Sequence, residues 1–358
     1  MFSLKETEDL WTRLRRESRP ILLYGTGDGA DKLFRALDYY GISVSDIFVS
    51  DEFYRNQTFR GYQCRTYGEI RERYPDAVIL LAFAVFRKDM LRWIREIGED
   101  YELLVPDLPV FGDDWYSMER YLREEKEIGE TLELLADDRS RSVFSDLIHY
   151  RISGKPSYLQ HCESPREEIF SDLFALSKEE DYVDLGAFRG DTISEFLEQT
   201  GGSFHSILAL EPDEKNFRKL QEYVGELGLS EEQKESVCLL PYASWSGSGI
   251  HSFDGGGGRS SALGEGKWTV ETRSVDSLLS GRQVTYLKMD VEGAERETLA
   301  GLSETLRTWK PKLAVSAYHR TEDLLLLPRL IRSGNPDYCI HLRHHPYYPA
   351  WETNYYAL

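Results

Sequence analysis

The stretch that decides the fold is Val183–Thr192, VDLGAFRGDT, a short apolar strand that runs into a glycine-rich turn and then into a helix. Gly186 and Gly190 have no side chain, so the backbone of this turn can approach a ligand closely. Two further segments follow at the spacing of a nucleoside-binding α/β site: Leu208–Asp213 (LALEPD) and Leu287–Glu295 (LKMDVEGAE). Together the three segments predict an open, doubly wound sheet with a nucleoside site at the carboxyl ends of its strands.

The acidic residues around the first turn indicate which of two classes of ligand the site binds. A dinucleotide requires Gly-x-Gly-x-x-Gly, so that N–H groups at the helix start can bind its pyrophosphate. Here Asp184 precedes the turn and Asp191 begins the helix, and these acids would repel a pyrophosphate but suit a ligand with a sulfonium and an amino group. Glu211 ends the second strand, where an open sheet presents a carboxylate to ribose hydroxyls. The pattern predicts S-adenosylmethionine as the cofactor, and for the first turn alone an ordinary strand, turn and helix is the alternative.

The same segments carry a resemblance to a known family. From about Ser142 to Leu358 the sequence resembles the FkbM family of S-adenosylmethionine-dependent methyltransferases, which mostly methylate oxygen on sugars, polyketides and other small molecules. Besides the three segments, the first extended to Tyr182, the resemblance rests on KPKLAVSAYH at 310–319, LRHH at 342–345 and ETNYY at 352–356. The resemblance implies a reaction but names no acceptor.

The resemblance also implies roles for residues at the strand ends. The first turn would be shaped by Asp184 and its glycines, Glu211 would hold the ribose, and Asp290, Glu292 and Gly293 would line the catalytic end of the fourth strand. Tyr242–Trp245 (YASW) is expected to end the third strand, where such a sheet offers backbone groups and an apolar surface to adenine. The predicted cofactor-binding residues are Asp184, Gly186, Ala187, Gly190, Asp191, Thr192, Glu211, Pro212, Asp213, Ala243, Ser244 and Asp290.

Three residues are candidates for catalysis. His319 follows the apolar strand Leu313–Ala317, so its imidazole is expected at the same sheet edge as Asp290 and Glu292, where it could accept a hydroxyl proton. A strand-end histidine bonded to a neighbouring carboxylate is the alternative interpretation. Acids in a first helical turn also satisfy free N–H groups, and Glu295 is assigned to that structural role. Oxygen and imidazole ligands suit Mg²⁺ or Mn²⁺, but no metal is included in the prediction.

Composition limits the partners. At 358 residues the chain is too long for one typical core, which predicts two domains. Its 43 basic and 62 acidic residues give a formal charge of −19, which argues against a nucleic-acid backbone or an anionic membrane surface as partner. The expected partner is a small-molecule acceptor that is neutral or cationic, or is recognised without phosphate attraction. The sequence leaves open whether the chain forms a homo-oligomer.

The cysteines point to a reducing compartment. Cys64, Cys162, Cys238 and Cys339 are far apart and form no Cys-x-x-Cys pair, so we expect reduced, mostly structural thiols and no metal site built on them. No charged-then-apolar leader opens the sequence, and it contains no stretch of about 18 apolar residues. A cytoplasmic location without membrane spans is therefore predicted.

The chain is expected to fold as two α/β domains joined by helices. Residues 1–110 are predicted to form a small Rossmann-like α/β domain, residues 111–155 a helical bridge and residues 156–358 the methyltransferase domain, a class I doubly wound sheet of seven strands closed by a hairpin. In the first domain, Gly25-x-Gly27-x-x-Ala30 follows the apolar strand Pro20–Tyr24. Both a nucleotide site and a purely structural turn fit this pattern.

Two further segments have open interpretations. Gly255–Gly258 is expected in a surface hairpin turn, and a mobile loop that closes over substrate is the alternative. His344 and His345 are expected in an exposed loop, although they could also frame an acceptor pocket.

These observations predict an enzyme that transfers the sulfonium methyl of S-adenosylmethionine to an acceptor hydroxyl. The expected acceptor is a sugar, a nucleotide-linked sugar or another small metabolite, and His319 or a carboxylate of Asp290 or Glu292 would remove its proton. A non-catalytic sensor or scaffold that binds S-adenosylmethionine or a nucleotide is the alternative. A nicotinamide oxidoreductase that uses the N-terminal turn is disfavoured, because the third glycine is missing there.

Overall fold

The computed structural model describes residues 2–112, 114–254, 262–263 and 268–358, which divide into two compact units. The N-terminal unit comprises Met1–Glu133, Asp138–Ser164 and Arg343–Thr353, and the C-terminal unit comprises Leu134–Asp137, Pro165–Leu342 and Asn354–Leu358. The predicted glycine loop at 255–258 lies outside the described residues. Within the described ranges, no helix combines the length and the apolar character that a membrane crossing requires.

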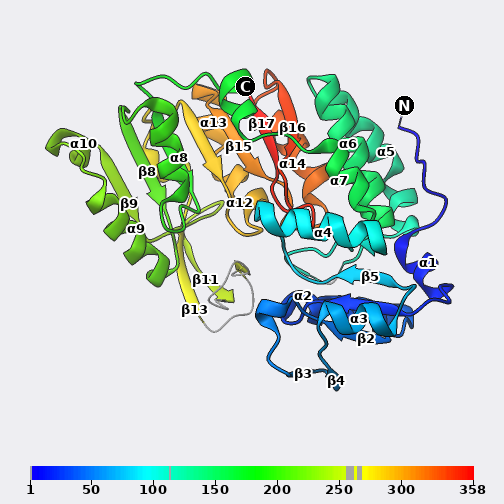
Figure 1. Cartoon of the computed structure of the whole chain (residues 1–358). Helices are drawn as coiled ribbons and strands as arrows, with labels where there is room; N and C mark the ends of the chain where they lie inside the picture. Colours follow the sequence, from blue (N-terminus) through cyan, green and yellow to red (C-terminus); the bar gives the residue numbers. More distant parts are fainter. Residues whose placement is uncertain (1, 113, 255–261, 264–267) are drawn as a thin grey trace. The chain divides into compact units, whose positions relative to one another are not determined.

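A four-stranded parallel sheet forms the centre of the N-terminal unit (Figure 1). Its strand order is β2 (Asp46–Phe48), β1 (Ile21–Tyr24), β5 (Val78–Leu81) and β6 (Glu102–Leu104). β1 and β5 are buried throughout, as expected for parallel strands that are covered on both faces. Further elements are α1 (Leu10–Arg15), α2 (Asp28–Tyr40), η1 (Asp51–Phe53), β3 (Thr58–Phe59), β4 (Tyr62–Gln63), α3 (Tyr67–Arg73), α4 (Lys88–Asp100), α5 (Met118–Leu134), α6 (Asp138–Ser153) and α7 (Pro156–Cys162).

Residues 343–353 group with this N-terminal unit although they lie near the other end of the sequence. The N–H of Tyr348 donates to the Val85 carbonyl at 2.8 Å, and the N–H of Val85 donates to the Tyr348 carbonyl at 2.7 Å. His344 and His345 were expected in an exposed loop, but both are buried, and His345 Nδ1 lies 2.8 Å from the Ser164 carbonyl oxygen. Burial, together with the adjacent His345, lowers the pKa of His344 to about 3, so that this imidazole is neutral.

A seven-stranded sheet forms the centre of the C-terminal unit (Figure 1). Its strand order is β16 (Ile340–His344), β17 (Thr353–Ala357), β15 (Lys312–Ser316), β14 (Tyr286–Met289), β7 (Asp181–Leu185), β8 (Ser206–Leu210) and β9 (Val237–Leu240). The five strands from β15 to β9 pair in parallel, whereas β17 pairs antiparallel with β15. The predicted α/β fold with a parallel sheet is therefore confirmed.

Helices and a second, smaller sheet accompany the seven strands. The smaller sheet has the order β10 (Ala243–Ser244), β13 (Trp268–Arg273), β11 (Gly249–Asp254) and β12 (Ala262–Leu263). The helices of the unit are η2 (Ile169–Leu173), α8 (Asp191–Thr200), α9 (Glu214–Glu226), α10 (Glu231–Glu235), α11 (Val275–Leu279), α12 (Glu295–Ala300), α13 (Ser303–Trp309) and α14 (Asp323–Gly334).

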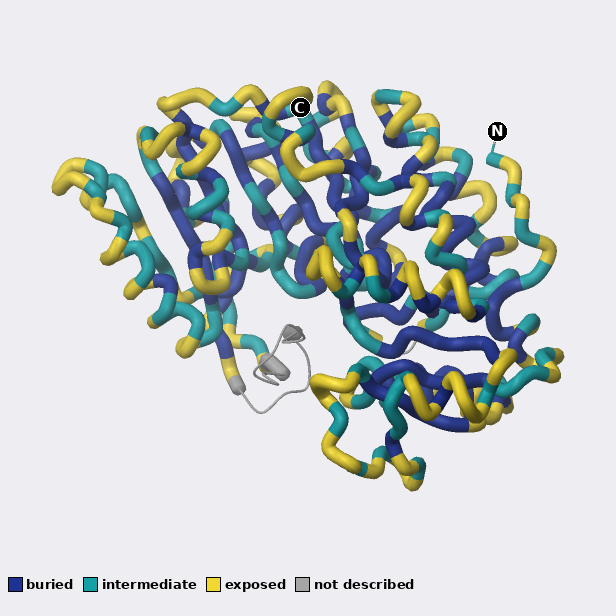
Figure 2. The backbone as a smooth tube through the Cα atoms, viewed as in Figure 1, coloured by how far each residue is buried: buried dark blue, intermediate teal, exposed yellow. Residues whose placement is uncertain are grey.

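The core of the C-terminal unit lies around its central strands, which Figure 2 shows as buried. Tyr182 on β7 stacks against Tyr286 on β14 with ring centroids 4.9 Å apart, and Phe196 on α8 stacks against Tyr182 at 4.4 Å. A local cap begins α9, the helix that follows β8. Asp213 is the N-cap of α9, and its Oδ1 accepts a hydrogen bond from the Asn216 N–H at 2.8 Å.

Candidate functional site

The topology brings four strand ends to one edge of the large sheet. β15, β14, β7 and β8 are consecutive parallel neighbours, so their carboxyl ends lie at the same edge. The loops that leave this edge are residues 186–190 after β7, 211–213 after β8, 290–294 after β14 and 317–322 after β15. In open α/β sheets, ligands bind outside the carboxyl ends of the strands.

The turn after β7 requires glycine at two positions. Gly186 has φ +82°, and a Cβ there would lie 1.9 Å from the carbonyl oxygen of Asp290. Gly190 has φ +93°, and a Cβ there would lie 2.3 Å from the ring of Tyr223. Phe188 between them also adopts a positive φ of 47°, a strained conformation for a residue with a side chain. The turn is therefore held closely against its neighbours.

Asp184 supports this turn from the protein interior. Its side chain is fully buried, and its Oδ2 accepts a hydrogen bond from the Thr192 hydroxyl at 2.5 Å. Lys288 Nζ lies 3.6 Å from Asp184 Oδ1 and donates to the Gly186 carbonyl at 2.9 Å. Burial raises the pKa of the Asp184 carboxyl, while Lys288 opposes this shift. Asp184 is therefore held by Lys288 and Thr192, and its cofactor role stays a prediction.

Glu211 follows β8 and is held by two backbone groups. Its Oε2 accepts from the Phe188 N–H and its Oε1 from the Asp213 N–H, each at 2.9 Å. The side chain is buried, and burial raises the pKa of Glu211 to about 7 although the two N–H groups oppose this shift. Each carboxylate oxygen can accept a further hydrogen bond, since each has two lone pairs. Glu211 therefore offers two fixed acceptors beside the glycine turn.

A cluster of carboxylates surrounds His319. The Nε2 atom lies 3.3 Å from Asp290 Oδ1 and 3.5 Å from Glu292 Oε2, and Nδ1 lies 2.9 Å from Glu295 Oε1. His319 and Glu295 are each 1% exposed, whereas Asp290 and Glu292 are half-buried. Tyr318 donates its hydroxyl to Asp290 Oδ1 at 3.2 Å. The structure thus brings all three predicted catalytic residues together and adds Glu295 to them.

The charge state of His319 differs from the one that the sequence analysis expected. Burial alone would lower the pKa of His319, but Glu295, Asp290 and Glu292 together raise it to about 10. The imidazole is therefore protonated at neutral pH and has no free lone pair to accept a hydroxyl proton. The prediction that His319 acts as a neutral base has to be corrected for this reason.

The pKa values of the carboxyl groups in the cluster shift in opposite directions. Although burial opposes the shift, Lys288 and His319 lower the pKa of Asp290. Burial raises the pKa of Glu292 to about 8, and the same cause raises the pKa of Asp323, at the start of α14, to about 8. Glu292 also has a positive φ of 53°, which marks the loop after β14 as strained.

Comparisons with known proteins identify the region that contains this edge. Residues 184–335 match the sequence profile of the methyltransferase FkbM domain. The chain contains an FkbM methyltransferase domain. The match begins at Asp184 and includes the site residues described above, as far as Asp323. Membership of this family implies methyl transfer that depends on S-adenosylmethionine. No curated protein matches the chain significantly.

One solved structure shares the fold over nearly the whole chain, and two others are similar over little more than half of it. The methyltransferase FkbM from Methylobacillus flagellatus has 22% sequence identity and a TM-score of 0.74, over 96% of this chain and 91% of that one. Precorrin-6y C5,15-methyltransferase from Geobacter metallireducens has 10% identity and a TM-score of 0.33, over 57% of this chain and 87% of that one. Fibrillarin from Aeropyrum pernix, solved with S-adenosylmethionine, has 14% identity and a TM-score of 0.33, over 51% and 69% of the two chains.

One predicted segment of the FkbM methyltransferase domain lies elsewhere than expected. Tyr242–Trp245 was expected to end the third strand, but β9 ends at Leu240, and Ala243 and Ser244 form β10, which pairs with β13 in the smaller sheet. The Ser244 hydroxyl lies 2.9 Å from that of Thr298, and both side chains are buried. The strand assignment was wrong, whereas the cofactor role of these two residues stays a prediction.

The other predicted residues of the FkbM methyltransferase domain lie at the expected strand ends. Ala187 is buried, and its N–H donates to the Leu210 carbonyl at 3.0 Å. Asp191 is exposed in the first turn of α8, and Pro212 is half-buried between Glu211 and the N-cap of α9. Their cofactor roles also stay predictions, since these positions alone do not establish contact with a ligand.

Three side chains of this edge were not predicted from the sequence. Lys288 could have been found as a lysine within the apolar strand LKM, and Tyr318 as the neighbour of His319. Arg320, whose Nε donates to the Gly293 carbonyl at 2.8 Å, joins the loops after β14 and β15. No sequence pattern indicated this last contact, because the two residues come from separate segments.

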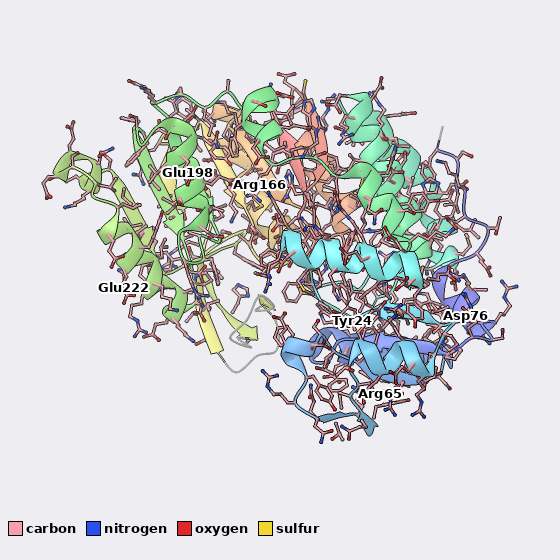
Figure 3. All side chains as sticks on the ribbon, in the orientation of Figure 1. Tyr24, Arg65, Asp76, Arg166, Glu198 and Glu222 are labelled. Atoms are coloured by element: carbon pink, nitrogen blue, oxygen red, sulfur yellow. The ribbon has the colours of Figure 1, made fainter. Side chains whose placement is uncertain are left out.

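A surface hollow of the FkbM methyltransferase domain lies away from these residues. It is lined by residues of α8, α9 and α10 and their following loops, among them Glu198, Tyr223 and Gln233. Figure 3 labels Glu198 on α8 and Glu222 on α9. The hollow lies mainly at the C-terminal ends of α8 and α9, whereas the candidate site lies at the helix starts. Tyr223, which lines the hollow and also packs against Gly190, is the point at which the hollow approaches the glycine turn.

Proposed function

We propose that this protein transfers the methyl group of S-adenosylmethionine to a hydroxyl oxygen of a small acceptor. The observation that carries the proposal is Glu211, a carboxylate fixed by two backbone N–H groups at the end of β8 and directly beside the turn of Gly186–Gly190. A carboxylate at this position suits a pair of ribose hydroxyls, which donate hydrogen bonds that a charged acceptor strengthens.

The residues of the edge fit S-adenosylmethionine on two grounds. Each oxygen of Glu211 accepts one backbone hydrogen bond and keeps capacity for another, which matches two neighbouring hydroxyls. The end of β14 carries Asp290 and Glu292, and carboxylates favour a nearby sulfonium cation. When bound, S-adenosylmethionine supplies an electrophilic methyl group on that sulfonium. The remaining predicted cofactor residues would complete the site.

Glu292 is the residue that we assign as the proton acceptor. It is half-buried at the sheet edge, and its Oε2 has no hydrogen-bond partner among the described residues. Its pKa of about 8 means that Glu292 accepts the proton in its ionised form, whose share rises as the pH approaches 8, whereas His319 would lose its own proton only near pH 10. Asp290, by contrast, accepts from Tyr318, and His319 is protonated. When bound, S-adenosylmethionine would transfer its methyl group to the acceptor oxygen, and its sulfur would keep the bonding pair as a neutral thioether. Glu292 would take the hydroxyl proton.

The net charge of the protein limits the chemical classes of acceptor that it can bind. A formal charge of −19 opposes polyanions such as nucleic acid. We therefore propose a neutral or cationic hydroxylated molecule, a sugar or a related metabolite, with a nucleotide-linked sugar as the most negatively charged case. The four cysteines are free thiols, which supports a reducing compartment such as the cytoplasm.

The experiment that tests the proposal combines binding with turnover. Calorimetry on the wild-type chain should show saturable binding of S-adenosylmethionine. Release of S-adenosylhomocysteine is then measured with a panel of sugars, nucleotide sugars and small hydroxylated metabolites. Turnover with any of these acceptors supports the enzyme. Binding without turnover on every acceptor would favour a sensor or scaffold instead, and absence of binding would overturn the cofactor assignment.

A further inference from the structure

The cluster around His319 gathers three carboxyl groups around one imidazole. Asp290, Glu292 and Glu295 all place a carboxylate oxygen within 3.5 Å of an imidazole nitrogen. Lys288 Nζ, 3.8 Å from Asp290 Oδ2, divides its charge between Asp290 and the buried carboxylate of β7. Since His319 and Glu295 are almost fully buried, water screens these charges poorly. The cluster therefore favours an additional positive charge.

Three side chains of the cluster present ligand atoms at metal-binding separations. One atom each of Asp290, Glu295 and His319 lies within 4.8 Å of the other two. Two ligand atoms of one octahedral Mg²⁺, each about 2.0–2.1 Å from the ion, are about 3 Å apart when adjacent and about 4.2 Å apart when opposite.

A buried oxygen in this group lacks a partner. Glu295 Oε1 accepts a hydrogen bond from the Val291 N–H at 3.1 Å and lies 2.9 Å from His319 Nδ1. Glu295 Oε2 is equally buried, but it has no hydrogen-bond partner in the described part of the chain. A buried carboxylate oxygen without a partner is unfavourable, and a bound cation would satisfy it.

Neighbouring groups orient the proposed ligands. The Tyr318 hydroxyl donates to Asp290 Oδ1, and the Val291 N–H donates to Glu295 Oε1. Arg320 holds the Gly293 carbonyl and so fixes the loop that carries two of the carboxylates. Hydrogen bonds of this kind set the direction of ligating carboxylates in metal sites.

We propose that Asp290, Glu295 and His319 bind a divalent cation, Mg²⁺ or Mn²⁺, at the carboxyl end of β14. The imidazole of His319 releases its proton to solvent as the cation binds, because only the neutral ring can act as a ligand. Oxygen and imidazole ligands suit these ions. Binding of the cation does not depend on the proposed function. A role of the cation in catalysis does rest on the proposed function, in which a divalent cation at this place would lower the pKa of the acceptor hydroxyl. In the proposed reaction, the bound cation would give the acceptor hydroxyl a second binding partner besides Glu292.

Titration with Mn²⁺ tests this inference on the 358-residue chain. The protein is first stripped of metal with a chelator, and free Mn²⁺ is followed by electron paramagnetic resonance. The wild type should bind one Mn²⁺ per chain, and Mg²⁺ should displace it. Asp290→Asn and Glu295→Gln should each weaken Mn²⁺ binding by roughly tenfold or more. The control is His205→Gln, because His205 pairs with Asp181 at 2.7 Å but lies outside the cluster, and it should bind Mn²⁺ normally.

Three outcomes decide the inference. A wild type without saturable Mn²⁺ binding overturns it, as does binding that survives in both carboxylate variants. If Glu295→Gln fails to fold, Asp290→Asn decides, since Asp290 is half-buried and its replacement keeps the shape. Calorimetry with S-adenosylmethionine on the same samples separates the two proposals. Cofactor binding without Mn²⁺ binding overturns only the cation site, and Mn²⁺ binding without cofactor binding overturns only the proposed function.

Discussion

Gly186 and Asp290 meet backbone to backbone: a Cβ atom on Gly186 would lie 1.9 Å from the carbonyl oxygen of Asp290. The two residues come from the ends of neighbouring strands, β7 and β14. The turn proposed to receive the cofactor thus rests directly on the loop that carries the candidate catalytic carboxylates. This contact places the two halves of the site directly against each other.

Replacement of Gly186 tests this contact. Gly186→Ala should lower the free energy of unfolding by about 2 to 4 kcal/mol, because the positive φ and the overlap with Asp290 both oppose a side chain. Gly201→Ala is the matched control, since Gly201 also has a positive φ of 63° but nothing lies within 4 Å of the added Cβ. It should cost about 1 kcal/mol. Urea unfolding measures both, and equal losses would show that the contact has no role.

Replacement of Glu211 tests the cofactor assignment. Glu211→Gln should weaken S-adenosylmethionine binding by at least tenfold, since each charge-assisted hydrogen bond contributes roughly 1.5 to 3 kcal/mol. Glu222→Gln, an exposed change on α9, should leave the affinity unchanged. Isothermal calorimetry gives both dissociation constants, and an unchanged affinity in Glu211→Gln would remove this residue from the site.

The raised pKa of Glu211 predicts how its replacement changes stability with pH. Folding raises this pKa from 4.5 to about 7, so the folded state binds the proton more tightly than the unfolded state. The resulting stability is fully present below about pH 4.5 and is lost as the pH rises through 7. Between pH 5 and pH 8 the wild type should therefore lose about 2 kcal/mol relative to Glu211→Gln. Urea unfolding of both proteins at the two pH values measures this difference, and a constant difference would contradict the burial of a titrating carboxyl.

Replacement of Glu292 tests the proton acceptor. Glu292→Gln should lower kcat by about 10² to 10⁴, because a positioned base contributes a factor of that size, while the affinity for S-adenosylmethionine stays nearly constant. Glu304→Gln, an exposed change in α13, serves as the control with normal turnover. The assay is S-adenosylhomocysteine release with an acceptor found active. Normal turnover of Glu292→Gln would assign the proton to Asp290 instead.

The strand ends of the candidate site could be predicted from the sequence, because local chemistry determines them. An apolar run followed by Gly186 and Gly190 indicates a strand and a turn without any knowledge of the neighbours. Glu211 follows a second such run. Since the ends of parallel strands share an edge, the sequence was sufficient to expect Asp290, Glu292 and His319 at that edge as well.

The charge states of the site could not be predicted, because they depend on contacts between separate segments. The pKa of His319 reflects three carboxylates that approach both of its nitrogens in a buried place. Glu295 had a complete local explanation as an acid in a helical first turn, so nothing in its spacing indicated contact with His319. The short strand of Ala243 and Ser244 was missed for a similar reason, since its pairing partner β13 lies some thirty residues further along the chain.

The membership of residues 343–353 in the N-terminal unit has a consequence for synthesis on the ribosome. The reciprocal hydrogen bonds between Val85 and Tyr348 join residues whose translation is separated by most of the chain. Domains generally fold in order as they emerge, the N-terminal one first. Here the N-terminal unit must wait for residues 343–353, so its completion follows the synthesis of most of the C-terminal unit.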